Sequence, residues 1–227
     1  MNSPIESGFP AECRRCGTCC RKGGPTLQKE DRLLVETGKL PLGLLVTIRK
    51  GEIVREPQSG CLIRAEEEMI KLKGAGTGWC CILFDEAQDR CTRYEYRPVQ
   101  CRAMACWDTA EIEQVMKAPR LNRADLLSGI EGLWALIEDH EHRCGVDAMG
   151  ELAAAVGRRE EKAEDRLMEM LRYDTVLRGL LTEKKTEAEH LDFLLGRSLD
   201  GLLGGFGLLL ERKDGRIRPV PVSPDIS

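Results

Sequence analysis

Clustered cysteines are the residues of this sequence that could do chemistry. Near the N-terminus they form the run Cys-x-x-Cys-x-x-Cys-Cys, whose short gaps let successive thiolates turn toward one centre. Gly17 lies inside the run and relieves steric limits in so tight a loop. A second set follows at wider spacing, Cys-x9-Cys-x9-Cys-x4-Cys. The two sets give eight predicted metal ligands: Cys13, Cys16, Cys19, Cys20, Cys81, Cys91, Cys101 and Cys106.

Two kinds of metal centre fit these ligands, zinc and an iron–sulfur cluster. Structural zinc takes four ligands, often from two Cys-x-x-Cys pairs, and the wide gaps of the second set fit that pattern poorly. Three cysteines at two-residue gaps are typical of ferredoxin-type clusters, whose fourth thiolate comes from elsewhere. The adjacent Cys19 and Cys20 would need unusual geometry to bind one mononuclear ion. They indicate two centres, or one cluster that leaves one of them over, and the metal stays open between zinc and iron–sulfur.

On these residues the chain resembles the YkgJ-type cysteine-cluster family, described as a zinc- or iron-chelating domain. That family has a CxxCxxCC motif near its start. It continues with a Cys-x-x-Tyr-x-x-Arg-Pro-x-x-Cys-Arg segment, here Cys91, Tyr94, Arg97, Pro98, Cys101 and Arg102. The family pattern places a cysteine directly before an apolar Ile-Leu-Phe, which selects Cys81 over Cys80. The resemblance covers residues 13–107 and implies metal binding rather than a defined activity.

Three classes of function follow. The first is a metal-binding module with a structural or metal-delivering role, and the second is a redox protein with an iron–sulfur centre. The third is an iron–sulfur-dependent enzyme such as a protein methyltransferase. It is implied only by one relative, the flagellin lysine-N-methylase, which carries a similar cysteine motif. The sequence contains three histidines and no His-Glu-x-x-His motif, which argues against a hydrolytic zinc enzyme. Whether the protein is an enzyme therefore stays open.

The remaining cysteines and histidines have simpler interpretations. Cys61 and Cys144 lie outside both sets, so we expect packed or exposed free thiols rather than ligands. His140-x-His142-x-Cys144 could bind a further metal, because His140 and Cys144 would share one face of a helix. The charged residues between them favour a solvated helix end instead.

Glycines and charges give weaker signals. The glycine-rich segment 74–78 follows an apolar strand, as nucleotide-binding loops do, but a second predicted strand follows it where such a loop would open a helix. We therefore expect a hairpin. Arg97 or Arg102 could offset thiolate charge, or pair with a surface acid. The charge run Arg158–Arg166 is typical of a solvated helix face.

Composition restricts the compartment and the partners. The formal net charge is −4 with both signs interspersed, which does not favour nucleic acid as a partner. The first twelve residues lack the basic and apolar regions of a secretion signal, and no apolar run is long enough for a bilayer. We expect a cytoplasmic protein, where thiols stay reduced. The metal ion is the expected partner, no membrane is involved, and a protein partner stays open.

The cysteines also divide the chain, because ten of the eleven lie before residue 107. We predict an α+β fold in which a small, irregular, cysteine-rich metal-binding domain is followed by a helical C-terminal region. The expected limits are 1–108 for the cysteine-cluster domain, 109–212 for the mainly helical region and 213–227 for a proline-containing tail.

Local patterns predict the elements within this division. A helix is expected over 28–37 with Gly38 as its stop, and strand pairs over 44–48 with 52–55 and over 69–73 with 80–84. One helix should run from an Asn122 N-cap to Gly145, and a second over 158–181. Short helices are expected over 191–195 and 199–203, and a hairpin over 207–211 and 216–220, with fraying from Pro219.

Overall fold

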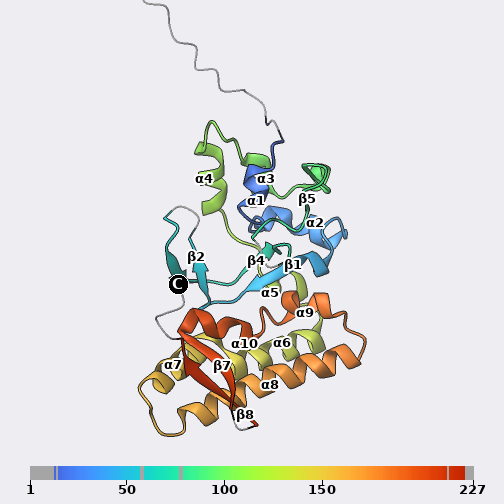
Figure 1. The fold of residues 1–227 in the computed structure, drawn as a ribbon. Helices are drawn as coiled ribbons and strands as arrows, with labels where there is room; N and C mark the ends of the chain where they lie inside the picture. The colour runs from blue at the N-terminus through green and yellow to red at the C-terminus, as the bar shows by residue number, and fades with distance from the viewer. Residues whose placement is uncertain (1–12, 14, 57–58, 77–78, 214, 223–227) are drawn as a thin grey trace, which may run out of the picture. The chain divides into compact units, whose positions relative to one another are not determined.

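The structure is a computed structural model, and it describes residues 13, 15–56, 59–76, 79–213 and 215–222 (Figure 1). The chain forms two compact units. Unit 1 consists of Met1–Pro41 and Lys71–Leu121, and unit 2 consists of Leu42–Ile70 and Asn122–Ser227. The fold is α+β, with helices dominating the C-terminal part, which confirms the predicted class. The predicted domain limits of 1–108, 109–212 and 213–227 stay a prediction. The two units are defined differently, by which segments contact one another in the folded chain.

Unit 1 is built from short helices and strands. Its sheet is minimal: β5 and β6 are antiparallel, with Phe84 opposite Cys91 and Asp85 opposite Arg90. Isolated bridges join Thr26 to Lys71 and Gln28 to Arg120. Its elements are α1 (Thr18–Arg21), η1 (Lys29–Asp31), α2 (Arg32–Glu36), β5 (Phe84–Asp85), β6 (Arg90–Cys91), η3 (Tyr94–Tyr96), α3 (Val99–Ala103) and α4 (Ala110–Lys117).

The helix expected over 28–37 is present as η1 followed by α2. Gln28 begins it, because its backbone N–H donates to the Asp31 carboxylate at 2.9 Å. Gly38 follows the end of α2 with a left-handed φ of 69°, as expected for a helix stop. The glycine-rich segment after β4 is closed by an antiparallel bridge between Gly74 and Cys81, which agrees with a hairpin-like turn. Residues 77 and 78 of that segment lie outside the described residues.

Unit 2 contains the long helices and the larger core. Strand β2 pairs antiparallel with β3, strand β1 pairs with β4, and β7 pairs with β8. Its elements are η2 (Leu42–Leu44), β1 (Leu45–Ile48), β2 (Ile53–Arg55), β3 (Leu62–Arg64), the start of β4 (Met69–Leu72), α5 (Arg123–Leu127), α6 (Glu131–Cys144), α7 (Val146–Gly157), α8 (Ala163–Glu183), η4 (Ala188–His190), α9 (Leu191–Leu194), α10 (Leu199–Leu202), η5 (Leu203–Phe206), β7 (Leu208–Lys213) and β8 (Arg216–Pro221).

Strands β1 and β2 occur where they were expected, but their predicted pairing is wrong. The turn at residues 49–51 leads each strand to a different partner, because Gly51 and Glu52 bond to Ala65 instead of closing a local hairpin. The predicted pairing over 69–73 with 80–84 is also incomplete, because β5 begins only at Phe84 and pairs with β6. Strand propensity located these segments, but hydrogen-bonding partners depend on which edges meet in the folded chain.

The helical prediction for unit 2 is correct in type and inexact in limits. Asn122 caps α5, accepting a hydrogen bond from the Asp125 backbone N–H at 3.0 Å, as expected. The helix that follows is interrupted at residues 128–130 before α6, which ends at Gly145. Gly145 has φ −56°, not the left-handed value of a typical C′ glycine, because it also begins α7. Helix α7 was not predicted, and α8 starts at Ala163, so the first part of the charged run is an exposed loop.

The core of unit 2 is aliphatic and centres on α7 and α8 (Figure 1). Its fully buried members include Met149, Leu167 and Leu199, and Cys144 at the end of α6 packs among them. The short helices α9 and α10 and the β7–β8 hairpin confirm the prediction for 191–220. Fraying from Pro219 is wrong, because Pro219–Pro221 lie in β8, opposite Leu208–Leu210. Residues 223–227 of the predicted tail lie outside the described residues.

Among the helices of the described residues, none is both long enough and apolar enough to cross a bilayer.

Candidate metal centre

The loop that carries the first cysteine motif is held by contacts within unit 1. Gly17 has φ 69° and begins α1, so Cys19 and Cys20 lie on that short helix. Arg21, at the end of α1, donates to the carbonyl of Cys16 at 2.9 Å and to the Asp89 carboxylate at 2.6 Å. The Arg21 guanidinium also lies 4.7 Å from the centre of the Phe84 ring. The loop is therefore fixed onto the segment that separates Cys81 from Cys91.

A direct backbone contact joins the two motifs. The Cys81 N–H donates to the carbonyl of Cys20 at 2.8 Å. Phe84 donates its N–H back to the Cys81 carbonyl at 2.9 Å, and Phe84 is paired with Cys91 in the β5–β6 ladder. This tight turn and short ladder bring Cys91 back toward Cys81, although nine residues separate them in the sequence.

Cys101 reaches the same region on α3. The helix follows Pro98, whose carbonyl accepts the Cys101 N–H at 2.9 Å. The Asp31 carboxylate accepts the N–H of Val99 at 2.8 Å, so it satisfies one unpaired donor at the start of α3. Burial raises the pKa of Asp31, against the lowering effect of its bonds from Gln28 and Val99. A buried side chain of η1 thus positions the helix that carries a predicted ligand.

The electrostatics of the thiols link the two motifs. Burial raises the pKa of Cys20 to about 12, and the neighbouring thiols of Cys19, Cys81 and Cys91 add to the shift. Burial likewise raises the pKa of Cys81 to about 11, with Cys91 contributing. The pKa of Cys101 is also raised, by burial first and then by Cys81, Cys19, Cys20 and Cys91. Five of the eight predicted ligands, from both motifs, therefore lie near enough to affect these pKa values.

The other three predicted ligands are exposed, as Cys19 is: Cys13, Cys16 and Cys106. Cys16 lies 3.2 Å from the Thr18 hydroxyl, and this hydrogen bond lowers the pKa of the thiol. Cys80, which the family pattern passed over in favour of Cys81, is half-buried, and Cys61 is exposed in unit 2.

Aromatic and basic side chains of the two motifs make contacts that spacing did not reveal. Two guanidinium groups lie over the Tyr94 ring, that of Arg97 at 3.5 Å and that of Arg15 at 4.1 Å from the ring centre. Arg15 belongs to the first motif and Tyr94 to the second, so this stack is another link between them. Arg102 pairs instead with Glu30 at 2.7 Å. The sequence pattern had singled out Tyr94 and Arg97 as part of the family-like segment. It gave no signal for Arg15.

In the described part of the chain, these five thiols do not form a compact ligand set. Among the described residues, two groups of three potential ligands have all their ligand atoms within 4.8 Å of one another. Both lie in unit 2: His140 with Cys144 and Asp174, and Glu187 with Glu189 and His190. The choice of eight cysteines as the ligand set accordingly stays a prediction.

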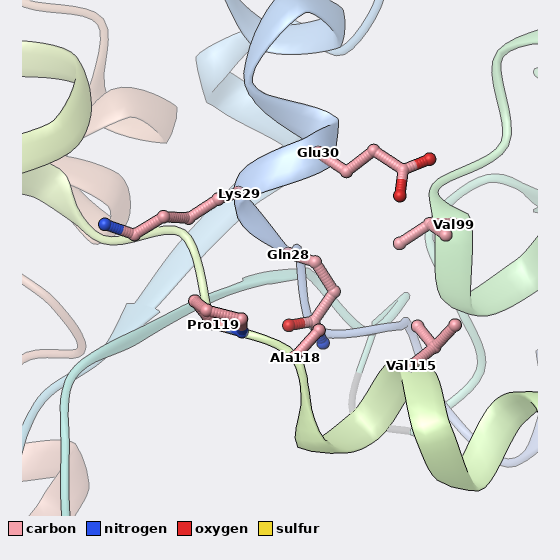
Figure 2. Close-up of a pocket in the computed structure, with 7 residues that line it drawn as sticks. All are labelled: Gln28, Lys29, Glu30, Val99, Val115, Ala118 and Pro119. Atoms are coloured by element: carbon pink, nitrogen blue, oxygen red, sulfur yellow. The ribbon is translucent and has the colours of Figure 1, made fainter.

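The described part of unit 1 carries at least two hollows. The one in Figure 2, about 180 Å³, is bounded by η1, α3 and α4, and its lining contains no cysteine. Val99 and Val115 face into it, while Lys29 extends away from them (Figure 2). The other, about 320 Å³, is lined by residues 90–96 and so includes Cys91 and Tyr94. Only the second hollow belongs to the cysteine region.

One comparison with known proteins gives a match over the cysteine-rich segment. The family model CxxCxxCC, described as a "putative zinc- or iron-chelating domain", matches residues 12–120. Residues 12–120 are therefore similar to the CxxCxxCC family. The CxxCxxCC match includes all eight predicted ligands and ends just before α5. No curated protein and no solved structure matches the chain.

Proposed function

We propose that this protein binds zinc or an iron–sulfur centre through its clustered cysteines, in a structural or redox role. One observation carries the proposal: the Cys81 N–H donates to the Cys20 carbonyl at 2.8 Å, and the ladder that follows pairs Cys91 with Phe84, so segments of the two motifs meet in unit 1. The zinc- or iron-chelating description of the CxxCxxCC family supports metal binding in general.

The chemistry of the converging thiols is consistent with a bound cation. Neighbouring thiols add to the effect of burial on the pKa values of Cys20 and Cys81, because several thiolates in one place repel one another. A metal ion removes this repulsion and takes thiolates as its preferred soft ligands. Cys19, Cys20, Cys81, Cys91 and Cys101 would hold it, and Cys13, Cys16 and Cys106 complete the proposed ligand set.

The number of nearby thiols does not by itself select the metal. A mononuclear structural zinc site and an iron–sulfur cluster each take four protein ligands. Five nearby thiols therefore fit a pair of ions that share the cysteines, or either single centre with one thiol left over. The bound metal would stabilise unit 1 in either case, and an iron–sulfur centre would add a redox couple.

Anaerobic purification followed by elemental analysis and visible absorption spectroscopy tests the proposal. We expect near-stoichiometric metal, with sulfide-linked visible bands if iron is bound and a colourless protein if zinc is bound. Replacing Cys20 or Cys101 with serine should lower the metal content, because water replaces a lost thiolate poorly. Cys61→Ser is the matched control, since its exposed thiol lies in unit 2.

Two outcomes would contradict the proposal. One is protein that is metal-free after anaerobic purification and does not take up zinc or reconstitute a cluster. The other is equal metal loss in Cys20→Ser, Cys101→Ser and Cys61→Ser, which would put the ligands elsewhere.

We infer that the protein lies in the cytoplasm, because reduced thiols persist there.

The alternative function is an iron–sulfur-dependent protein methyltransferase. It rests on family resemblance, and no feature of the described residues adds to it. Methyl transfer from S-adenosylmethionine to a protein, measured with the metal-loaded chain, would favour that alternative.

A further inference from the structure

Three potential metal ligands meet inside unit 2, away from the cysteine motifs. His140 and Cys144 stand one helical turn apart on α6, and Asp174 lies in the middle of α8. One ligand atom from each lies within 4.8 Å of the other two. All three residues are buried, with exposed fractions of 0%, 0% and 2%.

The imidazole of His140 has one nitrogen bound and one free. Its Nε2 lies 2.7 Å from the Asp174 carboxylate, whereas Nδ1 is buried with no hydrogen-bond partner in the described part of the chain. A buried polar atom without a partner is uncommon. A neutral imidazole binds an ion through one nitrogen only, so an ion shared with Asp174 would bind at Nε2 in place of the hydrogen between them and leave the ring proton on Nδ1.

We propose that His140, Cys144 and Asp174 form a second metal site, for a divalent transition-metal ion such as Zn²⁺. Imidazole nitrogen, thiolate sulfur and carboxylate oxygen are the three ligand types that zinc takes in proteins. On binding, the thiol proton of Cys144 passes to the buffer and the sulfur–metal bond takes its place. The thiolate and the carboxylate together neutralise the charge of the ion.

This inference revises the interpretation drawn from the sequence, which treated Cys144 as a free thiol and His140 as part of a solvated helix end. The acidic and basic neighbours do form an exposed face, where Arg143 pairs with Asp139 at 2.9 Å. His140 and Cys144 lie on the opposite, buried face. Asp174, 34 residues beyond His140, could not be found from spacing.

Charged groups around the site limit its affinity. Arg178 donates to both Asp174 oxygens, at 3.1 and 3.0 Å, and the Leu199 N–H donates to one of them at 3.0 Å. Arg49 donates to the carbonyl of Cys144 at 3.1 Å. Arg178 competes with the ion for the carboxylate, so this site should bind more weakly than the cysteine cluster and lose its metal first to a chelator.

Zinc uptake by the full chain tests the proposal. The starting protein is the double variant Cys20→Ser/Cys101→Ser, which weakens the cluster of unit 1, held under reducing conditions and stripped of metal. We expect it to take up one zinc ion that is lost when Cys144→Ser or His140→Gln is added. Addition of Cys61→Ser removes a thiol of the same unit and should leave that ion bound.

X-ray absorption at the zinc edge of the double variant gives a readout that does not depend on those added variants. We expect a mixed shell of nitrogen or oxygen with a single sulfur. The proposal is overturned by a sulfur-only shell, by absence of zinc uptake in the folded double variant, or by equal uptake with and without Cys144→Ser. Each of these results would leave the His140–Asp174–Arg178 contacts as a hydrogen-bonded link between α6 and α8.

Discussion

At the residue scale, a single glycine determines how closely the first cysteine motif can approach its support. Gly17 has a left-handed φ, and a Cβ placed on it would lie 2.2 Å from the Phe84 ring. Both the backbone conformation and the close approach exclude a side chain there. Because Phe84 is paired with Cys91, this contact also sets the distance between the two motifs.

We therefore expect Gly17→Ala to destabilise unit 1 by roughly 1–3 kcal/mol and to lower its metal content. Denaturant unfolding together with metal analysis measures both effects. Gly132→Ala is the control, since nothing lies within 4 Å of a Cβ at that helical position. Equal stability and metal content in the two variants would show that the loop moves freely away from Phe84.

The stacked Arg15–Tyr94–Arg97 set makes a second prediction at this scale. Tyr94→Leu keeps an apolar side chain but loses both cation–π contacts. We expect metal to leave the cluster several-fold faster when a chelator is added, followed by absorbance or a metal-sensitive dye. Tyr96→Leu is the matched control, because Tyr96 contacts Lys39 rather than a residue of the first motif. Indistinguishable rates would remove the stack from the account of the site.

At the scale of elements, one buried guanidinium joins several segments of unit 2. Arg123, at the start of α5, donates to Glu68 after β3, to Glu141 on α6 and to the carbonyl of Leu194 on α9. Its side chain is 2% exposed. These polar contacts hold α5 in place. A helix of five residues is too short to be stable by itself.

Arg123→Met should destabilise unit 2 by about 2–4 kcal/mol, because Glu68 loses its buried partner and Glu141 keeps only the longer pair with Arg49 at 3.7 Å. Both carboxylates keep some contact with solvent, which moderates the loss. Arg143→Met, which breaks an exposed pair with Asp139, should change stability little. Thermal unfolding of the two variants decides the matter, and similar melting temperatures would contradict the importance of burial.

At the scale of the whole molecule, the two units differ in what stabilises them. Unit 2 has a contiguous aliphatic core around α7 and α8. In unit 1 the regular elements are short, and its cysteine-bearing segments meet through a few backbone bonds and the converging thiols. Bound metal can supply much of the folding free energy of such a small, irregular region.

Removal of metal should therefore loosen unit 1 and leave unit 2 folded. With a strong chelator present, we expect faster amide hydrogen exchange over the described parts of 13–41 and 71–121, and little change in α6, α7 and α8. Segment 42–70 should stay protected, although it lies between cysteine motifs in the sequence, because it belongs to unit 2. Uniform loss of protection, or none at all with the metal removed, would contradict the coupling.

Much of the local structure could be predicted from local signals. The Asn122 cap, the Gly38 stop and the turn between β7 and β8 act over a few residues, so their effect is visible in the sequence. Strand pairing was predicted less well, because β1 and β2 find partners that no nearby residue specifies.

Sequence patterns alone predict the α+β class, the cysteine motifs and the resemblance to a metal-chelating family, because two-residue spacing and caps are properties of neighbouring residues. The folded structure was needed to show that Cys20 contacts Cys81, that Arg15 stacks on Tyr94, and that His140 and Cys144 meet Asp174. These contacts join residues far apart in the sequence. Their distances follow from how helices and loops pack, and packing depends on the whole chain at once.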